Sequence, residues 1–417
     1  MKKHQIKSAI SAAVVGILSP LAMAVPASAA TATWAGRHPI GSYNGLASTA
    51  SNWVGSYSPL LNDSVVFGTS GINQIIEFDG AHTVPVGSTP TLDLASIVFS
   101  GAWTASTTSD KNYVISSVNI LKLSGNIESI MTGAGGTQAV KASVALQTDS
   151  TFKTAGSSSL AVGDTATTLD LGAKNLTLDA SGGTISLLGK ITGTGNLIKA
   201  GTGKVSILTT PGTGGFSGGL TVPAGEVNAV GTLGNVTLTG GTLKGTGTVG
   251  IVTMSSGTVA PGASPGVLNT GNLVFTGGTH AVELGGKAAG EFDQLNVTGT
   301  VGLGAETTLN LSLVNSFAPA VNDSFVIIAN DATDAVTGTF KGMADGSKVT
   351  LGSYTYQINY DGGTGNDVVI LVTGTPSAPD TGVGTLIGNP LMTLFAALMV
   401  AGVVVGYRVH EVKKAKN

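Results

Sequence analysis

The sequence contains no cysteine, which excludes a disulfide framework and any thiolate metal site. Charged residues make up only 10% of the 417 residues, against about 25% in a typical domain, and aromatic residues only 5%. Arg37 and Arg408 are the two arginines, and the formal net charge is -3, which argues against capture of nucleic acid or another polyanion. A chain of this composition must be held together by backbone pairing and apolar burial.

Glycine is abundant instead, with 62 residues. Short apolar runs alternate with polar residues and are separated by Gly, Thr, Ser and Asn, and no sustained helical period is present between the two ends of the chain. This pattern predicts an all-β body. The predicted strands include residues 92–99, 118–123, 169–171, 176–178, 185–188, 205–208, 236–238 and 249–254.

Residues 1–29 have the three parts of a secretory signal peptide. Residues 1–7 carry three lysines and no acid, and residues 8–23 form a mainly apolar stretch. Ala27 and Ala29 then stand at the spacing of small residues that a signal peptidase recognises. We therefore expect export of the chain after about residue 29. The alternative is a soluble amphipathic helix, which the apolar residues on every face disfavour.

Residues 386–407 are predicted to form a transmembrane helix. The stretch is apolar apart from Asn389, Thr393 and a few small residues, and it is close to the roughly 20 residues that a helix needs to cross hydrocarbon. The basic tail, residues 408–417, indicates the cytoplasmic side, so the body is expected at the cell surface. A buried core helix is the alternative, but such a helix would not end in a cationic tail.

A linker, residues 373–385, precedes this span and contains Ala378-Pro379-Asp380-Thr381-Gly382. The spacing of Pro, Thr and Gly, followed by an apolar span and a basic tail, resembles the LPxTG-like sorting signal of sortase-anchored cell-wall proteins. The resemblance implies that a sortase cuts between Thr381 and Gly382 and joins Thr381 to an amine of the cell-wall peptide. Ala378 stands where that family usually has Leu, which leaves the sortase class open. A plain linker with a permanent membrane anchor is the alternative.

The middle of the chain contains a weak internal repeat. Gly-Thr-Gly recurs at residues 193–195, 201–203 and 245–247, each time beside a short strand. Self-similar strands with glycine at the corners are typical of a solenoid, in which each turn packs against its two neighbours. We expect turns of about 20 to 25 residues stacked about 4.8 Å apart. A compact sandwich is the alternative, but a body of about 340 residues exceeds the usual size of one domain.

Several segments resemble the passenger domains of autotransporter proteins. Residues 191–205 and 216–226 are similar to the two halves of the passenger-associated repeat, and residues 257–266 are similar to the turn that follows it. Further similar segments are Trp34-Ala35-Gly36, Asn52-Trp53 followed by Pro59 and residues 63–67, and residues 293–299, 336–340 and 360–368. The resemblance implies a right-handed parallel β-helix. We expect an N-terminal β capping region at residues 30–110 and β-helix repeats at residues 111–372.

The C-terminal part differs from that family. Autotransporters end in a membrane β-barrel, which is built from many strands of about ten residues each. Residues 373–417 instead carry the sorting-like tail described above. We therefore expect a passenger-type rod on a different anchor.

Two motifs could indicate metal sites. Residues 362–370, GGTGNDVVI, fit the calcium repeat of toxin-type β-rolls, but a single copy favours a tight turn in which Asp367 bonds its own loop. His38, His82 and His280 are far apart in sequence, and a lone histidine on such a surface is usually solvated. No metal and no cofactor is therefore predicted.

Parallel β-helices also include polysaccharide lyases and hydrolases, and a glycosidase needs two carboxylates within about 10 Å. The acids of this chain are mostly scattered singly, although stacked turns could bring distant acids together. They include Asp93, Asp110, Asp164, Asp170, Asp179, Glu226 and Glu283. We predict no catalytic residue and a surface-display function, either adhesion to a host or neighbouring cell or a structural coat. The expected partners are the membrane, a sortase with cell-wall peptide and a cell-surface ligand, and an envelope-attached carbohydrate-active enzyme is the alternative.

Overall fold

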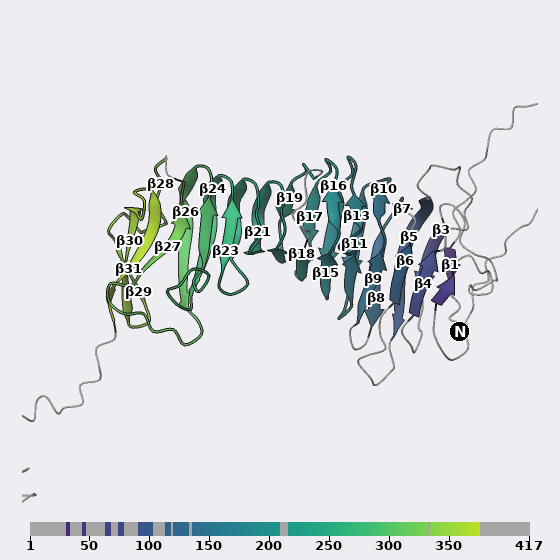
Figure 1. Cartoon of the computed structure of the whole chain (residues 1–417), viewed down its shortest axis with the longest axis horizontal. Coiled ribbons are helices and arrows are strands. Elements are labelled where there is room, and N and C mark those ends of the chain that lie inside the picture. Colours follow the sequence, from purple (N-terminus) through teal and green to yellow (C-terminus); the bar gives the residue numbers. More distant parts are fainter. Residues whose placement is uncertain are drawn as a thin grey trace, which may run out of the picture.

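A computed structural model describes residues 31–33, 44–46, 63–67, 74–78, 91–102, 113–117, 120–132, 136–208, 216–331 and 334–375. These ranges contain strands and no helix, which confirms the all-β prediction. Twenty-five strands form one curled sheet, in which the pairing is parallel, and six form a second sheet. The strands stand side by side in a long row, with β1 near one end and β29 to β31 at the other (Figure 1). The predicted signal peptide and transmembrane helix lie outside the described residues.

The chain coils through three sides, which we name A, B and C. Successive strands visit the sides in that order, so each strand pairs with the strand one turn earlier and the strand one turn later. Side A consists of β7 (Ile120–Leu123), β10 (Val144–Leu146), β13 (Thr168–Asp170), β16 (Lys190–Thr192), β23 (Val267–Thr270), β25 (Gln294–Val297) and β27 (Ser324–Ala329). Parallel bridges such as Thr232 to Thr248 connect its two halves.

Sides B and C contain more strands than side A. Side B consists of β1 (Thr31–Thr33), β3 (Asp63–Phe67), most of β5 (Thr91–Ala102), β8 (Ile127–Thr132), β11 (Ser150–Thr154), β14 (Leu176–Ala180), β17 (Leu197–Ala200), β19 (Leu220–Val222) and β28 (Thr337–Gly338). Side C consists of β2 (Asn44–Leu46), β4 (Gln74–Phe78), β6 (Tyr113–Ser117), β9 (Thr137–Lys141), β12 (Ser159–Val162), β15 (Thr184–Leu187), β18 (Lys204–Ile207) and β20 (Glu226–Ala229). Four long strands run through both sides: β21 (Val236–Gly245), β22 (Val252–Pro261), β24 (Leu273–Leu284) and β26 (Val301–Leu313).

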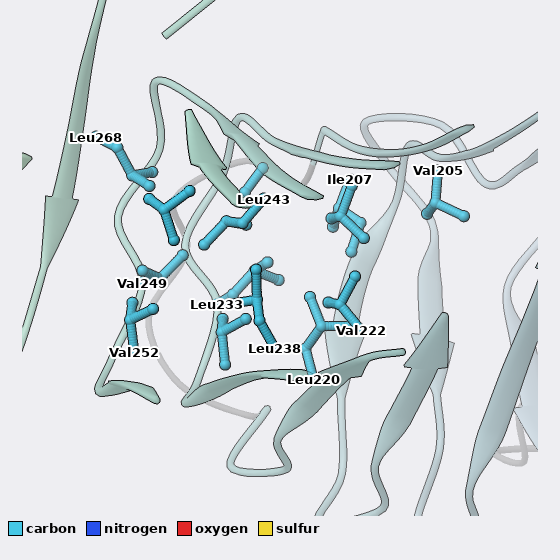
Figure 2. Close-up of a cluster of buried hydrophobic side chains, with 14 of the residues drawn as sticks. Val205, Ile207, Leu220, Val222, Leu233, Leu238, Leu243, Val249, Val252 and Leu268 are labelled. Atoms are coloured by element: carbon cyan, nitrogen blue, oxygen red, sulfur yellow. The ribbon is translucent and has the colours of Figure 1, made fainter. Parts of the chain in front are cut away.

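The core consists of rows of inward-facing side chains along the coil, with one residue from each turn, and we call each such row a file. Because strand side chains alternate between faces, each short strand sends every second residue inward, as in the BiBiB burial pattern of β14. On side B the inward file holds Ile127, Phe152, Leu178, Lys199, Val222, Leu238, Met254, Phe275 and Leu303, all buried. Figure 2 shows Val222 of β19 and Leu238 and Leu243 of β21 among the side chains that fill the inside of the coil.

The coil narrows at β21 and β22. On side B Leu197 pairs with Leu220, a repeat of 23 residues, which fits the predicted turn length. The pairs Leu220 to Val236 and Val236 to Val252 instead give repeats of 16 residues. The predicted length is therefore wrong for these narrow turns. The physical reason is a shorter path through side A: residues 230–235 and 246–251 separate Ala229 from Val236 and Gly245 from Val252, whereas residues 208–219 separate Ile207 from Leu220.

Glycine is required where the narrow turns change direction. Gly245 has φ 122°, a conformation that side chains rarely adopt, and a Cβ atom there would lie 1.9 Å from the Ala229 carbonyl oxygen. The corner can form only because this residue has no side chain.

The C-terminal end of the coil is closed by an antiparallel sheet, which we call the cap. β27 pairs with β31 (Asp367–Gly374), β31 with β30 (Tyr354–Gly362), and β30 with β29 (Lys348–Leu351), all antiparallel. Parallel repeats were expected up to residue 372, so the change in direction at β31 is a difference from that expectation. The short connections of β29, β30 and β31 allow hairpins, whereas parallel pairing needs a longer crossover.

Candidate functional site

The residues predicted for sorting and processing lie outside the described part of the chain. This applies to Ala378, Pro379, Asp380, Thr381 and Gly382 and to the cleavage residues Ala27 and Ala29. Within the described ranges, no helix is long and apolar enough to span a membrane. The candidate site must therefore be sought on the coil and its cap.

The outer surface of side B carries a file of hydroxyl and methyl groups. Strand register places one residue per turn in this file, in the order Thr151, Thr177, Ile198, Thr221, Thr237, Thr253, Val274 and Gly302. Neighbouring members are about 4.8 Å apart, the spacing of paired strands. This file is uncharged, whereas the next outward file of side B carries Glu128, Lys153 and Asp179 on three neighbouring turns.

Side C carries the main charge cluster of the coil surface. Glu226 on β20 binds Lys204 at 3.0 Å and Lys244 at 3.6 Å. Burial raises the pKa of Glu226, but the bonds and charges of the two lysines outweigh this effect, so the pKa lies below its usual value. These three partly exposed side chains neutralise one another across neighbouring turns, and each such pair adds at most about 1 kcal/mol.

A polar ladder follows the corner between sides A and B. At each of six turns a side-chain oxygen accepts a hydrogen bond from the backbone N–H one turn further on, at 2.9 to 3.2 Å. The acceptors are Asn126, Asp149, Asn175, Asn196, Asn235 and Asn272. The sequence analysis did not identify this ladder, although Asn or Asp just before a strand is the signal for it. Its oxygens serve corner geometry and are not free for a ligand.

Two carboxylates meet at the start of β23. Asp293 is 1% exposed, and its oxygens accept hydrogen bonds from the backbone N–H groups of Gly266 at 2.8 Å and Glu283 at 3.0 Å. The Glu283 carboxylate accepts a bond of 2.5 Å from the Ser264 hydroxyl. The coil thus brings Glu283, expected to stand alone, close to Asp293.

The electrostatics of this pair are unusual. Burial raises the pKa of Asp293 to about 7, although its two backbone donors act in the opposite direction, and the Glu283 charge adds to the rise. A carboxyl group with a pKa near neutrality can serve in acid–base chemistry. Here, however, both Asp293 oxygens already hold the turn at residues 261–266 against β24. The arrangement acts as a clamp between three segments of the coil.

Lys199 faces the core, which the sequence analysis did not predict. The residue is 0% exposed in the side B file, and its Nζ donates to the carbonyls of Ala200 at 2.6 Å and Gly201 at 2.8 Å. Burial lowers the pKa of Lys199, and the charge of Asp179 opposes this shift. One signal in the sequence predicts this position. Lys199 lies two residues after the buried Leu197, and residues two apart in a strand face the same side. The lysine ties a corner together and offers no group to solvent.

His280 is also buried, so its expected exposure is wrong. Its side chain is 0% exposed, lies 6.1 Å from the Phe340 ring in a stacked arrangement, and has Nδ1 3.4 Å from the Val259 carbonyl oxygen. The residue is in phase with the buried Val282 and Leu284, which places it in the inward file of side C. His38 and His82 lie outside the described residues. In the described ranges, no three His, Asp or Glu side chains are placed to hold a metal ion together.

The turn at residues 362–367 has the predicted tight geometry. Asp367 accepts hydrogen bonds from the backbone N–H of Thr364 at 2.8 Å and from the Thr364 hydroxyl at 3.2 Å. It also accepts a bond of 2.9 Å from the backbone N–H of Asn330, across from the turn. The expected bonding of Asp367 within its own loop is confirmed.

Comparisons with known proteins add no assignment. No protein-family model matches the chain, and no curated protein sequence matches it either. The functional argument therefore depends on the residues and geometry described above.

Proposed function

We propose that the chain is an exported bacterial surface protein, a right-handed parallel β-helix that is tethered at its C-terminus and acts as an adhesive or structural rod. The observation that carries this proposal is the regular, uncharged hydroxyl file of side B. Such a face suits weak contacts repeated along an extended partner. The segments 1–29, 378–382 and 386–407 supply the export, sorting and membrane signals of the same proposal.

The carboxylate pair gives the carbohydrate-active alternative no support. A glycosidase acid must reach the glycosidic oxygen, and its partner must reach the sugar or a water molecule. Asp293 is buried and accepts two backbone hydrogen bonds, and Glu283 accepts the Ser264 hydroxyl. Neither carboxylate is arranged to meet a substrate.

The contact face can be tested by changing single files of the coil. Thr237→Lys with Thr253→Lys adds two positive charges to side B, and Thr232→Lys with Thr248→Lys adds the same charge to side A as the control. We expect the side B variant to reduce attachment of displaying cells to one another or to a host-cell layer by at least about tenfold, and the side A variant to leave it unchanged. Equal attachment by both variants and the unmodified chain would remove side B from the proposal.

The tether is tested by mass spectrometry of the protein released from the cell envelope by wall digestion. We expect a C-terminal residue Thr381 that carries a wall fragment. Thr381→Ala should abolish this product, and Thr375→Ala, in the same linker, should not. Recovery of an intact Asn417 terminus with the membrane fraction would replace covalent sorting by a simple membrane anchor.

A further inference from the structure

The cap contains an oxygen-rich contact between two segments that are more than thirty residues apart. Asn330 and Asp334 lie on one side of it, and the turn ending at Asp367 lies on the other. The Asn330 side chain donates to the Asp334 carbonyl at 2.7 Å, and the Asn366 side chain donates to the same carbonyl at 3.0 Å and to the Asp331 carbonyl. Together with the bond from Asn330 to Asp367, these contacts fix both segments.

Two oxygen atoms in this contact are buried without a hydrogen-bond donor. They are Asn330 Oδ1, on a residue that is 8% exposed, and Asp334 Oδ2. The side-chain nitrogen of Asn330 donates to the Asp334 carbonyl, so the amide group that carries Oδ1 is held next to Asp334. A buried acceptor without a partner costs about 1 to 3 kcal/mol, and more when it is charged, so each such atom indicates an ion or water that satisfies it.

Cationic side chains do not provide this partner in the described part of the chain. The salt bridges there engage Glu226, Asp323 and Glu306, and none of them includes Asp334. Asp367 does not contribute a free carboxylate either, because both of its oxygens accept hydrogen bonds. The two unpartnered oxygens are therefore the distinctive feature of the contact.

We propose that this contact is a divalent cation site that prefers Ca²⁺, with Asn330 Oδ1 and the Asp334 carboxylate as its side-chain ligands. Carboxylate, amide and carbonyl oxygens are the ligands of Ca²⁺, which also accepts irregular geometry, whereas Mg²⁺ demands a near-ideal octahedron. With few charged ligands, the dissociation constant should lie in the range of about 10⁻⁴ to 10⁻³ M that extracellular modules show. The ion would fix Asn330 and Asp334 relative to each other, and both of these residues already hydrogen-bond to the last hairpin of the cap.

Calorimetric titration of the purified, chelator-treated full chain with CaCl₂ tests the site. We expect one binding event in the stated range, at least tenfold weaker in Asp334→Asn. Asp361→Asn removes the same charge from an exposed position near the turn and should bind as the unmodified chain does. Equal weakening in both variants would indicate diffuse attraction to acidic residues and would overturn the assigned ligands.

Hydrogen exchange of the unmodified chain provides a readout that does not depend on any variant. Bound Ca²⁺ should slow exchange in residues 328–331 and 364–370 at least severalfold, with a smaller effect from equal MgCl₂ and no effect on β14 or β17. Absence of both binding heat and local protection at millimolar Ca²⁺ would overturn the proposal, since water would then satisfy the two oxygens.

Discussion

The burial of His280 on β24 makes the coil sensitive to acid. Burial lowers the pKa of His280 from 6.5 to about 4, while the carbonyls of Val259 and Ile327 act in the opposite direction. The unfolded chain therefore binds a proton near pH 6.5, but the folded chain resists protonation until about pH 4. The free energy of unfolding should fall as the pH drops between these two values. A difference of about 2.5 pKa units corresponds to about 3 kcal/mol.

The perturbation that isolates this effect is His280→Leu. Apolar residues occupy the same inward file on the two neighbouring turns, Val259 on one side and Leu309 on the other, so the variant should pack without a large cavity. It also removes Nε2, which has no hydrogen-bond partner of good geometry among the described residues. At pH 7 the variant should lie within about 1 kcal/mol of the unmodified chain.

Urea unfolding at a series of pH values, followed by circular dichroism and by hydrogen exchange of β24, measures the effect. Other titrating groups are shared by both proteins, so their contributions cancel in the difference between the two stabilities. We expect this difference to change by about 3 kcal/mol in favour of the variant between pH 7 and pH 4. Parallel stability curves over that range would refute the argument from burial.

Three further predictions concern other parts of the coil. Because burial favours protonated Asp293, its contribution to stability should be lost as the pH rises from about 4 to about 7, so the stability difference between the unmodified chain and Asp293→Asn should change over that range in thermal melts, and a constant difference would contradict the argument. Lys199→Ala should lower the free energy of unfolding in urea by about 3 kcal/mol, because it leaves a cavity and two unpaired carbonyls. Lys199→Met should recover about half of this loss, because its side chain fills the cavity. Equal losses in the two variants would contradict the packing role. Gly245→Ala should lower the free energy of unfolding by about 3 kcal/mol or more. Gly172→Ala should lower it by about 1 kcal/mol, because Gly172 has φ 55° and open space around its Cβ position. Equal melting temperatures of the two variants would contradict the steric argument.

Much of the strand pattern could be predicted from the sequence. Segments such as 176–178 and 185–188 alternate between apolar and polar residues, and they form β14 and β15 with the expected inward and outward faces. The alternation is informative because each turn buries one face of its strand and solvates the other. The regular hydroxyl file of side B follows from the same pattern.

Other features depend on contacts that a local pattern does not contain. The narrow turns arise because the chain crosses side A in the short segments 230–235 and 246–251, and the Glu283–Asp293 clamp depends on a loop that folds back beside β24. Lys199 was missed because a charged residue between Ile198 and Ala200 looks like a surface position, although its phase with Leu197 places it inside. The antiparallel cap requires knowledge of which strands pair, and short apolar runs do not specify direction.

The position of β31 determines how the molecule would respond to mechanical force. β31 ends at Gly374, and it lies between β27 and β30, with antiparallel hydrogen bonds on both sides. A pull on Gly374 along the strand would load both rows of bonds in shear, so several bonds must break together. A strand at the edge of the sheet could instead be peeled away one bond at a time. The cap thus places a strand that is paired on both sides at the point where tension from the proposed C-terminal tether would enter the coil.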